Sequence, residues 1–402
     1  MKKKLLFISS RFLFPADSGG KIRTTQILRG MKNGAFEITL LSPSPELISG
    51  YQRDIDSICD HFLSWPEQKQ GRMFPLTRMR YLFSSLPIPV ITDRSAVGRK
   101  RVASELANGP DVVVFDFPHS VIHAPENIDI PSVMFTHNVE AEIFYRHTRV
   151  AGNPATRAIW KNQYKKMFDL EKKTLARFDL NIAVSARDAD YFRKHFHLDN
   201  IRQIPTGTDL DYYSYQTPGE NKRLVFTGSM DWSANIDGLT YFIESIWPAV
   251  LHADPDVTLQ VVGRNPPAQM VKKYTRQQSG IEFTGFVDDV RPYAWNAVVY
   301  IIPLRVGSGT RIKAFEAMAM GCPVVSTTLG VEGLGLVPEK HYLCADTQEA
   351  FINATIRLLN DKTLRETLSR NARQYVEENF SSQRVSDEFE TICLEAIDLK
   401  KS

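Results

Sequence analysis

Short apolar segments alternate with amphipathic stretches along almost the whole chain. The apolar segments are nearly continuous and do not alternate with polar residues, which is typical of strands covered on both faces of a parallel sheet. Helical patterns between them, such as residues 19–33 closed by Gly34, complete repeated β-α-β units. Strands are predicted at residues 4–9, 36–42, 111–116, 131–137 and 180–185, and again at 223–228, 257–263, 281–285, 298–304, 323–327 and 342–345.

The predicted strands fall into two sets separated by residues 201–223, a stretch rich in Pro, Gly, Thr and Asp. A chain of 402 residues is also too long for one typical core. We therefore predict an α/β protein with two doubly wound, Rossmann-like domains and a helical C-terminal region. The first domain is expected over 1–205, the second over 206–380, and a last helix over 381–402.

The opening segment, "MKKKLLFISSRF", superficially resembles a secretory signal peptide. Its apolar core is too short, Arg11 interrupts it, and no small-residue cleavage site follows in a suitable place, so a first buried strand is predicted instead. No apolar run approaches the roughly 20 residues that span a bilayer. These features predict a cytoplasmic protein.

Composition changes this picture little. With 43% hydrophobic and 24% charged residues, the chain is typical of a soluble globular protein. Its 49 Lys and Arg against 46 Asp and Glu leave a net charge of +3, which argues against a nucleic-acid partner. The cysteines lack metal-site or disulfide spacing and are typical of inert thiols in a reducing cytoplasm; they are Cys59, Cys322, Cys344 and Cys393.

Residues 69–90 form a basic, amphipathic and partly aromatic segment. Its cations, Lys69, Arg72, Arg78 and Arg80, are interleaved with apolar and aromatic side chains. Such a segment can lie on an anionic membrane surface, here the inner face of the cell membrane. A helix packed on the core with solvated cations has the same pattern, so both interpretations stay open.

A loop-and-helix motif, "GSGTRIKAFEAMAMGCPVVS" at 307–326, carries the clearest chemistry. It follows the predicted strand 298–304 and therefore occupies the carboxyl edge of the sheet, where open parallel sheets bind ligands. Gly307 and Gly309 let a ligand approach the backbone, and Thr310 is placed to cap the following helix. The exposed amides and positive dipole end of such a helix favour an anion such as phosphate.

Three ionisable side chains follow in the same motif. Arg311 and Lys313 add positive charge at the helix start, and arginine can contact a phosphate with two prongs. Glu316 lies three residues after Lys313, hence on nearly the same helix face. It can accept hydrogen bonds from the sugar hydroxyls of a nucleotide, and no buried partner is expected for it. The alternative is an ordinary surface pair between Lys313 and Glu316.

These residues and several others resemble a known enzyme family. "PLRVGSGTRIKAFEAMAMGCPVVS", with "LVFTGSMDWSANIDGLTYFIESIWP", "LQVVGRNP" and "FTGFVDDVRPYAWNA", is similar to retaining glycosyltransferases of family four, which have the GT-B fold. "FPADSGGKIRTTQILRGM" and "FTHNVEAEIF" fit a bacterial exopolysaccharide subgroup that includes sugar transferases accompanying PEP-CTERM sorting systems. The likeness spans nearly the whole chain. It implies two domains that face a central cleft, with the last helix packing back on the first domain.

The resemblance implies that the second domain binds a nucleotide sugar and the first binds the acceptor. Glu316 matches the second glutamate of the family's Glu-x7-Glu motif, which contacts the nucleotide ribose. Ser308 stands where the first glutamate is expected. Because this glutamate is absent, the backbone amides from Gly307 to Thr310 are the candidates for positioning the donor sugar ring.

Further donor contacts follow from the same likeness. Gly228 matches a glycine close to the donor phosphates, but the Arg and Lys that many members carry just after it are absent from "SMDWSAN". Arg264 joins the two cations of the motif as the predicted substitute in a diphosphate clamp. Phe286 and Val287 stand where the family lines the nucleobase pocket.

In the first domain the resemblance implies three site residues and a fourth candidate. Gly19 and Gly20 form a glycine-rich loop near the donor phosphates and the acceptor, although glycines that merely permit a turn are the alternative. His137 matches the family's active-site histidine near the transferred sugar, whereas a lone histidine is often only a polar core residue. Asp116, which also ends a strand, is a weaker candidate at the same edge.

The predicted reaction moves a sugar from a nucleoside diphosphate to a glycan or polyprenyl-linked acceptor with retention of anomeric configuration. Arg311 and Lys313 stabilise the leaving diphosphate, which itself accepts the acceptor's proton, while His137 orients a hydroxyl. Closure of the domains excludes water. The sequence has no Asp-x-Asp motif or ligand cluster at metal spacing, so no metal, and no cofactor besides the nucleotide-sugar co-substrate, is expected.

Three other functions fit parts of the pattern. A nicotinamide-dependent oxidoreductase needs a tight G-x-G-x-x-G turn, whereas the loop after the first strand, "SRFLFPADSGG", is far longer. A nucleotide-sugar epimerase shares the two-domain fold but needs acid and base residues at the cleft and no acceptor. A non-enzymatic two-domain ligand-binding protein would normally be exported, and the missing signal peptide speaks against it. The last two stay as alternatives to the glycosyltransferase.

Overall fold

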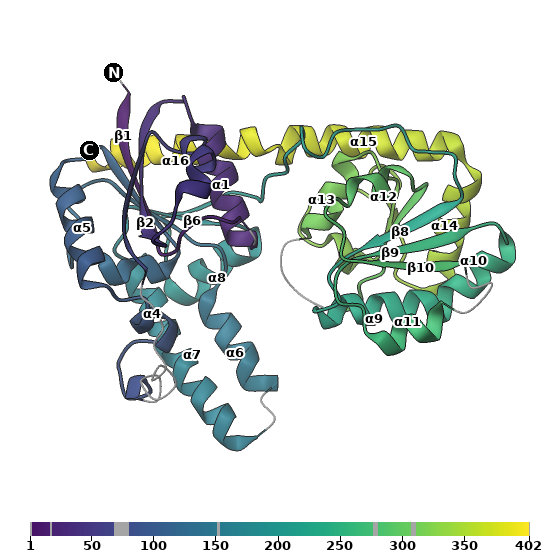
Figure 1. Cartoon of the computed structure of the whole chain (residues 1–402), viewed down its shortest axis with the longest axis horizontal. Helices are drawn as coiled ribbons and strands as arrows, with labels where there is room; N and C mark the ends of the chain where they lie inside the picture. The colour runs from purple at the N-terminus through teal and green to yellow at the C-terminus, as the bar shows by residue number, and fades with distance from the viewer. Residues whose placement is uncertain are drawn as a thin grey trace. The chain divides into compact units, whose positions relative to one another are not determined.

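The computed structural model describes residues 2–16, 18–67, 80–150, 153–275, 280–306 and 311–401. The chain divides into two compact units, residues 1–207 with 383–402, and residues 208–382 (Figure 1). Each unit is built on one parallel sheet with helices, as the apolar runs predicted. No helix within the described ranges is long and apolar enough to cross a membrane.

The first unit contains a seven-stranded sheet in the order β3-β2-β1-β4-β5-β6-β7. All neighbouring strands are parallel. The five predicted strands are present, and β3 and β7 are additions at the two edges, where exposed positions interrupt the apolar pattern. The bounds are β1 Lys3–Ser9, β2 Phe36–Ser44, β3 His61–Pro66, β4 Val112–Asp116, β5 Ser132–Phe135, β6 Leu180–Ala183 and β7 Ile201–Gln203.

Helices cover both faces of this sheet because successive side chains of a strand point to opposite faces. Leu5 and Phe7 of β1 join a buried cluster with residues of α1 and α16, whereas Leu6 and Ile8 join another with residues of α5, α7 and α8. The helices are α1 Gly19–Met31, α2 Gln52–Asp56, α4 Ile88–Thr92, α5 Ala96–Ala107, α6 Glu140–Val150, α7 Pro154–Leu175, α8 Ala186–Phe196 and α16 Ser382–Lys401.

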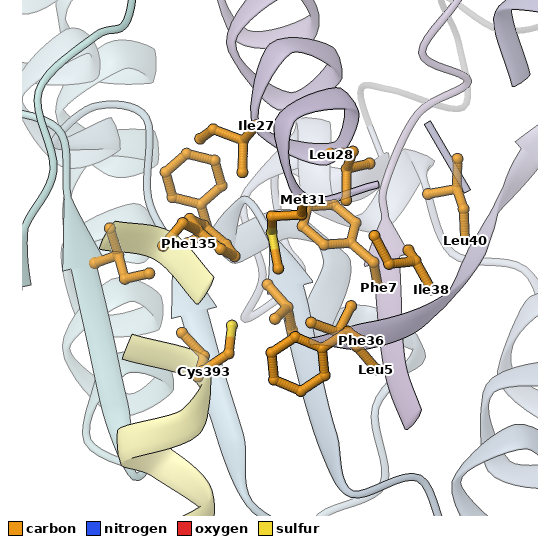
Figure 2. Packing of buried hydrophobic residues seen from close by; sticks show 14 of the residues in the cluster. Leu5, Phe7, Ile27, Leu28, Met31, Phe36, Ile38, Leu40, Phe135 and Cys393 are labelled. Atoms are coloured by element: carbon orange, nitrogen blue, oxygen red, sulfur yellow. The ribbon is translucent and has the colours of Figure 1, made fainter. Parts of the chain in front are cut away.

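The last helix, α16, is part of the core of the first unit. Its Phe389 and Cys393 are buried in the cluster that also contains Phe135 of β5. Figure 2 shows Cys393 among the labelled side chains of that cluster. Arg202 of β7 pairs with Glu395 on the same helix. The end of the chain therefore folds with its beginning.

The second unit contains a six-stranded parallel sheet in the order β10-β9-β8-β11-β12-β13. All six predicted strands are present, as β8 Arg223–Thr227, β9 Thr258–Val262, β10 Ile281–Gly285, β11 Val299–Ile302, β12 Val324–Ser326 and β13 Leu343–Cys344. The helices are α9 Ser233–Tyr241, α10 Trp247–Ala253, α11 Ala268–Tyr274, α12 Arg291–Trp295, α13 Ile312–Ala319, α14 Gln348–Asn360 and α15 Lys362–Phe380.

The strand order of the second sheet reverses beside its first strand in sequence. β8 lies between β9 and β11, so the chain leaves it in one direction and later returns on its other side. In sheets of this kind the loops after the two central strands diverge and leave a crevice at the carboxyl edge. The loops after β8 and β11 therefore define where a ligand is expected.

Candidate active site

A pocket of about 380 Å³ lies at the carboxyl edge of the second sheet. Its walls come from the ends of β8 and β9, the loops that follow β8, β9, β10 and β11, and the first turns of α9 and α13. The described residues that line it are Thr227, Gly228, Ser229, Trp232, Asn235, Val262, Gly263, Arg264, Phe286, Val287, Val290, Leu304, Arg311, Ile312, Lys313 and Glu316.

This pocket brings together the donor-site residues that the sequence predicted in the described part of the second unit. They are Gly228, Arg264, Phe286, Val287, Arg311, Lys313 and Glu316. The Phe286 side chain is 71% exposed, so its ring is available to a ligand and is not part of the core. The four loop residues predicted beside the donor sugar, Gly307, Ser308, Gly309 and Thr310, lie outside the described residues.

Lys313 extends from the first turn of α13 into the pocket. Its Nζ donates a hydrogen bond to Asn235 Oδ1 on α9 at 2.9 Å and lies 4.7 Å from the ring centroid of Phe226. Burial, with a smaller contribution from Arg311, lowers the pKa of Lys313 to about 7, against the opposing effect of Glu316. An anion beside Nζ would restore the charged form.

Glu316 lies one turn further along α13. Its Oε1 accepts a hydrogen bond from the Tyr213 hydroxyl at 2.7 Å. Burial raises the pKa of the Glu316 carboxyl, while Tyr213 and Lys313 act to lower it. Lys313 and Glu316 thus have separate hydrogen-bond partners, unlike the surface pair considered from sequence. The expectation that Glu316 has no partner was wrong, because Tyr213 is distant in sequence.

Two arginines complete the cationic lining. Arg311 immediately precedes α13 and is 3% exposed, with its Nη2 3.8 Å from Glu332 Oε2. Arg264 follows β9, and its Nε donates to Asp231 Oδ2 at 3.0 Å and to Ser229 Oγ at 3.3 Å. Cations therefore reach the pocket from two different loops, which suits a multiply charged anion such as a diphosphate.

Two glycines allow the loops after β8 and β9 to touch. A Cβ atom on Gly263 would lie 1.9 Å from the carbonyl oxygen of Gly228, and one on Gly228 would lie 2.7 Å from Asn235 Nδ2. That nitrogen donates to the carbonyl of Ser229 at 2.8 Å. The glycines thus make room for Asn235, which in turn accepts the hydrogen bond from Lys313.

A second polar cluster lies at the carboxyl edge of the first sheet. His137, two residues beyond β5, is 3% exposed and stacks on Phe117 with ring centroids 3.9 Å apart. Arg23 Nη1 donates to His137 Nδ1 at 3.2 Å, so Nε2 carries the proton and donates to Asp116 Oδ1 at 2.7 Å. Burial lowers the pKa of His137. The imidazole is therefore neutral, and both its nitrogens are bonded within the first unit.

The other predicted residues of the first unit surround this cluster. Asp116, the last residue of β4, is fully buried and also accepts a hydrogen bond from Ser9 Oγ at 3.0 Å. Gly19 and Gly20 form the first turn of α1. A Cβ on Gly20 would lie 2.6 Å from Phe117 Cζ, whereas one on Gly19 would meet no atom within 4 Å. Packing therefore requires a glycine at position 20 but not at position 19.

Sequence reasoning missed four residues that hold the predicted ones. Tyr213 and Asn235 reach α13 across 103 and 78 positions of sequence, and Arg23 reaches His137 across 114. Asp231 orients Arg264. Asn235 and Asp231 lie in "SMDWSAN", the stretch that departs from the family pattern, and this departure was the one signal that could have drawn attention to them.

Two family models match consecutive parts of the chain. The model described as Glycosyltransferase Family 4 matches residues 18–212, and the one described as Glycosyl transferases group 1 matches residues 221–361. Neither describes an epimerase or a binding protein, so these alternatives are not favoured.

Curated relatives agree with these matches. The "Uncharacterized 44.6 kDa protein in cps region" of Klebsiella pneumoniae is 21% identical over 395 residues, which cover 95% of this chain and 97% of that protein. A phosphatidyl-myo-inositol mannosyltransferase of Mycobacterium leprae is 30% identical over 173 residues, which cover 41% of this chain and 46% of that protein.

Solved structures share the fold. Sucrose-phosphate synthase from Thermosynechococcus elongatus superposes with a TM-score of 0.66 at 19% identity, over 97% of this chain and 98% of that one. HepE of Anabaena in complex with UDP gives a TM-score of 0.63 at 14% identity, over 97% and 99% of the two chains. These likenesses confirm the predicted fold of two doubly wound domains.

Proposed function

Because the chain is a glycosyltransferase with the GT-B fold, we propose that it transfers a sugar from a nucleoside-diphosphate donor to a glycan or lipid-linked acceptor. One observation carries this proposal: three cations, one carboxylate and an exposed aromatic ring meet in a single pocket of the second unit. A nucleoside diphosphate needs these three kinds of contact. The similar fold of HepE, solved with UDP, supports a nucleotide donor.

Each lining group has a role in this proposal. Lys313 and Arg311 bind the diphosphate from the start of α13, and Arg264 binds it from the loop after β9. Glu316 accepts hydrogen bonds from the ribose hydroxyls. Phe286 and its neighbour Val287 border the nucleobase.

Charge develops where these cations lie. As the bond between the anomeric carbon and the phosphate oxygen breaks, negative charge grows on the diphosphate, and Lys313 and Arg311 stabilise it. The acceptor hydroxyl attacks the anomeric carbon from the face that the diphosphate leaves, and it passes its proton to the departing phosphate oxygen. Attack from this face retains the anomeric configuration. Among the described lining residues Glu316 alone has a carboxylate, and it is bonded to Tyr213. This supports a mechanism without a carboxylate nucleophile, in which fixed cations replace a metal.

The first unit binds the acceptor in this proposal, and His137 orients a hydroxyl at the transferred sugar. The ring nitrogens of His137 are bonded to Arg23 and Asp116. Its role therefore requires that a sugar hydroxyl replace one of these two partners.

A panel of UDP-, GDP- and ADP-sugars tests the function, with released nucleoside diphosphate and glycosylated product measured together. We expect one donor class to yield both, with the donor's anomeric configuration in the product and no loss of rate in EDTA. Glu316→Ala should abolish donor use, and Glu349→Ala, an exposed change on α14, should not. Absence of product with every donor, or equal activity of the two variants, would contradict the proposal.

We also propose that the acceptor is reached at the inner face of a membrane, in the synthesis of a cell-surface polysaccharide. The Klebsiella relative is named for a cps region, which supports that context. In the described part of segment 69–90, Phe83 is 93% exposed. Residues 82–88 contact α7, because Lys166 Nζ donates to the Leu82 carbonyl at 2.7 Å and the Ile88 amide donates to Gln163 Oε1 at 2.8 Å.

Charge in the adjoining helices supports an anionic surface as the partner. Residues 143–168 contain six Lys and Arg and no Asp or Glu. Exposed Tyr145 and Ile159 add apolar area to the same helix pair, α6 and α7. Cations that approach anionic lipids contribute about 1 kcal/mol each.

Sedimentation with vesicles tests this membrane contact. We expect binding to phosphatidylglycerol vesicles and little to phosphatidylcholine vesicles. Lys161→Glu with Lys165→Glu should weaken binding at least tenfold, and Phe83→Ser should weaken it less. The control pair Lys172→Glu with Lys173→Glu changes the same charge on α7 outside the acid-free stretch. Equal loss in both pairs, or equal binding to both vesicle types, would exclude a specific surface.

A further inference from the structure

Tyr213 lies in a part of the chain that neither family model covers. The matched residues end at 212 and resume at 221. The second unit begins at residue 208, so Tyr213 belongs to its opening segment. From sequence this segment was only a boundary between domains. In the structure it supplies the hydrogen-bond donor to Glu316.

The backbone around Tyr213 is anchored to α13 and α15. Arg373 Nη1 of α15 donates to the Tyr213 carbonyl at 3.0 Å and to the carbonyl of Ala319, the last residue of α13, at 2.6 Å. The Gln216 amide donates to the Met320 carbonyl at 3.1 Å. One arginine thus ties Tyr213 to the helix that carries Glu316.

The first and last residues of α12 also hold this segment. Arg291 stacks on the Tyr212 ring at 3.8 Å and donates to the Tyr212 carbonyl at 2.9 Å. Trp295 Nε1 donates to the Ser214 carbonyl at 3.0 Å. These contacts hold the backbone on both sides of Tyr213, and with it the position from which the ring extends to Glu316.

The phenol also opposes the effect of burial on the carboxylate. Burial raises the pKa of Glu316, and the hydrogen bond from Tyr213 is the larger of the two effects that lower it, ahead of Lys313. Tyr300 of β11 also interacts electrostatically with this carboxylate, and burial raises the pKa of its hydroxyl, so Tyr300 stays neutral. Tyr213 therefore helps to keep Glu316 ionised.

We propose that Tyr213 is a positioning residue of the donor site: its hydroxyl holds the Glu316 carboxylate in the orientation that accepts hydrogen bonds from the donor's sugar hydroxyls. This inference rests on the proposed role of Glu316 as a donor ligand. It assigns to the segment between the two matched ranges a function in substrate binding.

Calorimetric titration with UDP, GDP and ADP tests the inference with Tyr213→Phe, which keeps the ring and removes the hydroxyl. A hydrogen bond to a charged group is among the stronger ones, so we expect the nucleotide that wild type binds to bind at least tenfold more weakly, a change of about 1.4 kcal/mol. Tyr212→Phe is the matched control, since it removes a hydroxyl from the adjacent tyrosine and keeps the ring on which Arg291 stacks. It should bind like wild type.

The pH profile separates positioning from mere packing. Glu316 accepts hydrogen bonds best when ionised, so affinity falls as the solution is acidified through its pKa. Without the Tyr213 hydroxyl this pKa rises further, and the fall should begin at a higher pH in Tyr213→Phe than in wild type. In a Glu316→Gln background, Tyr213→Phe should cause little further loss, because the two residues act as one unit.

The possible outcomes distinguish a failure of the proposed donor site from a failure of the proposed role of Tyr213. If wild type binds none of the three nucleotides, the proposed donor site fails, and this inference fails with it. If wild type and Tyr213→Phe bind equally well with the same pH profile, only the inference is overturned. An equal loss from Tyr213→Phe in the wild-type and Glu316→Gln backgrounds would also overturn it, since the effect would then be independent of Glu316.

Discussion

Both units carry polar side chains at the carboxyl edge of a parallel sheet, but the surroundings of these side chains differ. In the first unit His137, Asp116 and Arg23 are buried and bonded to one another. In the second, Lys313 and Arg264 are each held by a neighbouring side chain and line a pocket. Position at a carboxyl edge therefore does not by itself make a binding group. What distinguishes the second cluster is that its side chains line a pocket.

The largest expected effect is on catalysis in the second unit. Lys313→Ala should lower turnover about 1000-fold and weaken donor binding much less, because the ammonium acts on charge that develops as the bond breaks. Steady-state kinetics with the active donor and a separate titration of the nucleoside diphosphate measure the two quantities. Lys272→Ala, on the exposed surface of α11, is the control. A loss confined to affinity would show that Lys313 only binds the ground state.

The next effect is on the stability of the first unit. Asp116→Ala removes the carboxylate beside buried Arg23 and His137, so the free energy of unfolding should fall by about 3 kcal/mol. Asp231→Ala breaks the corresponding pair with Arg264 in the second unit, where both side chains are at least half exposed, and should lower the free energy of unfolding much less. Urea denaturation measures both. Similar losses in the two variants would remove the contrast between the clusters.

A smaller effect separates the two predicted glycines of the first unit. Gly20→Ala places a methyl group against the Phe117 ring, which packs on His137, and should destabilise the protein by about 2 kcal/mol. Gly19→Ala meets open space at the start of α1 and should be neutral or slightly stabilising. Melting temperatures of the two variants test this. Equal destabilisation by the two substitutions would show that both glycines serve only to permit a turn.

The smallest expected effect is the uptake of protons when a diphosphate binds. The pKa of Lys313 is lowered to about 7, so at pH 8 most of the lysine is neutral, and a bound diphosphate should draw in part of one proton. Diphosphate affinity should accordingly fall as pH rises above 7. Titration at pH 8 in buffers of different ionisation enthalpy measures the uptake, and Lys313→Met should abolish it. Unchanged uptake in that variant would assign the proton elsewhere.

The sheets were predictable because buried strands must be continuously apolar. Residues such as those of β4 and β11 are buried at every position, so their pattern admits few alternatives. β3 and β7 were missed because edge strands keep exposed positions, and β7 is only three residues long. The pattern reports burial, and strands that are only partly buried give little signal.

The site was predictable where its residues lie within one motif. Lys313 and Glu316 share a helix, and helix spacing places both on one face. Tyr213 and Asn235, their partners, come from segments 103 and 78 residues away, and no local pattern records such contacts. The predicted edge position of His137 was right, but its burial between Arg23 and Asp116 depends on tertiary packing.

The return of α16 to the first unit has a consequence for the order in which the chain assembles. Residues 208–382 are contiguous, so their core can close while the polypeptide is still being made. The earlier portion needs Phe389 and Cys393, which leave the ribosome after residues 208–382, to cover apolar side chains such as Phe7 and Phe135. Nascent domains ordinarily mature from the amino end onward. We expect this one to mature in the opposite order, with residues 1–207 completed only after the second unit has been made.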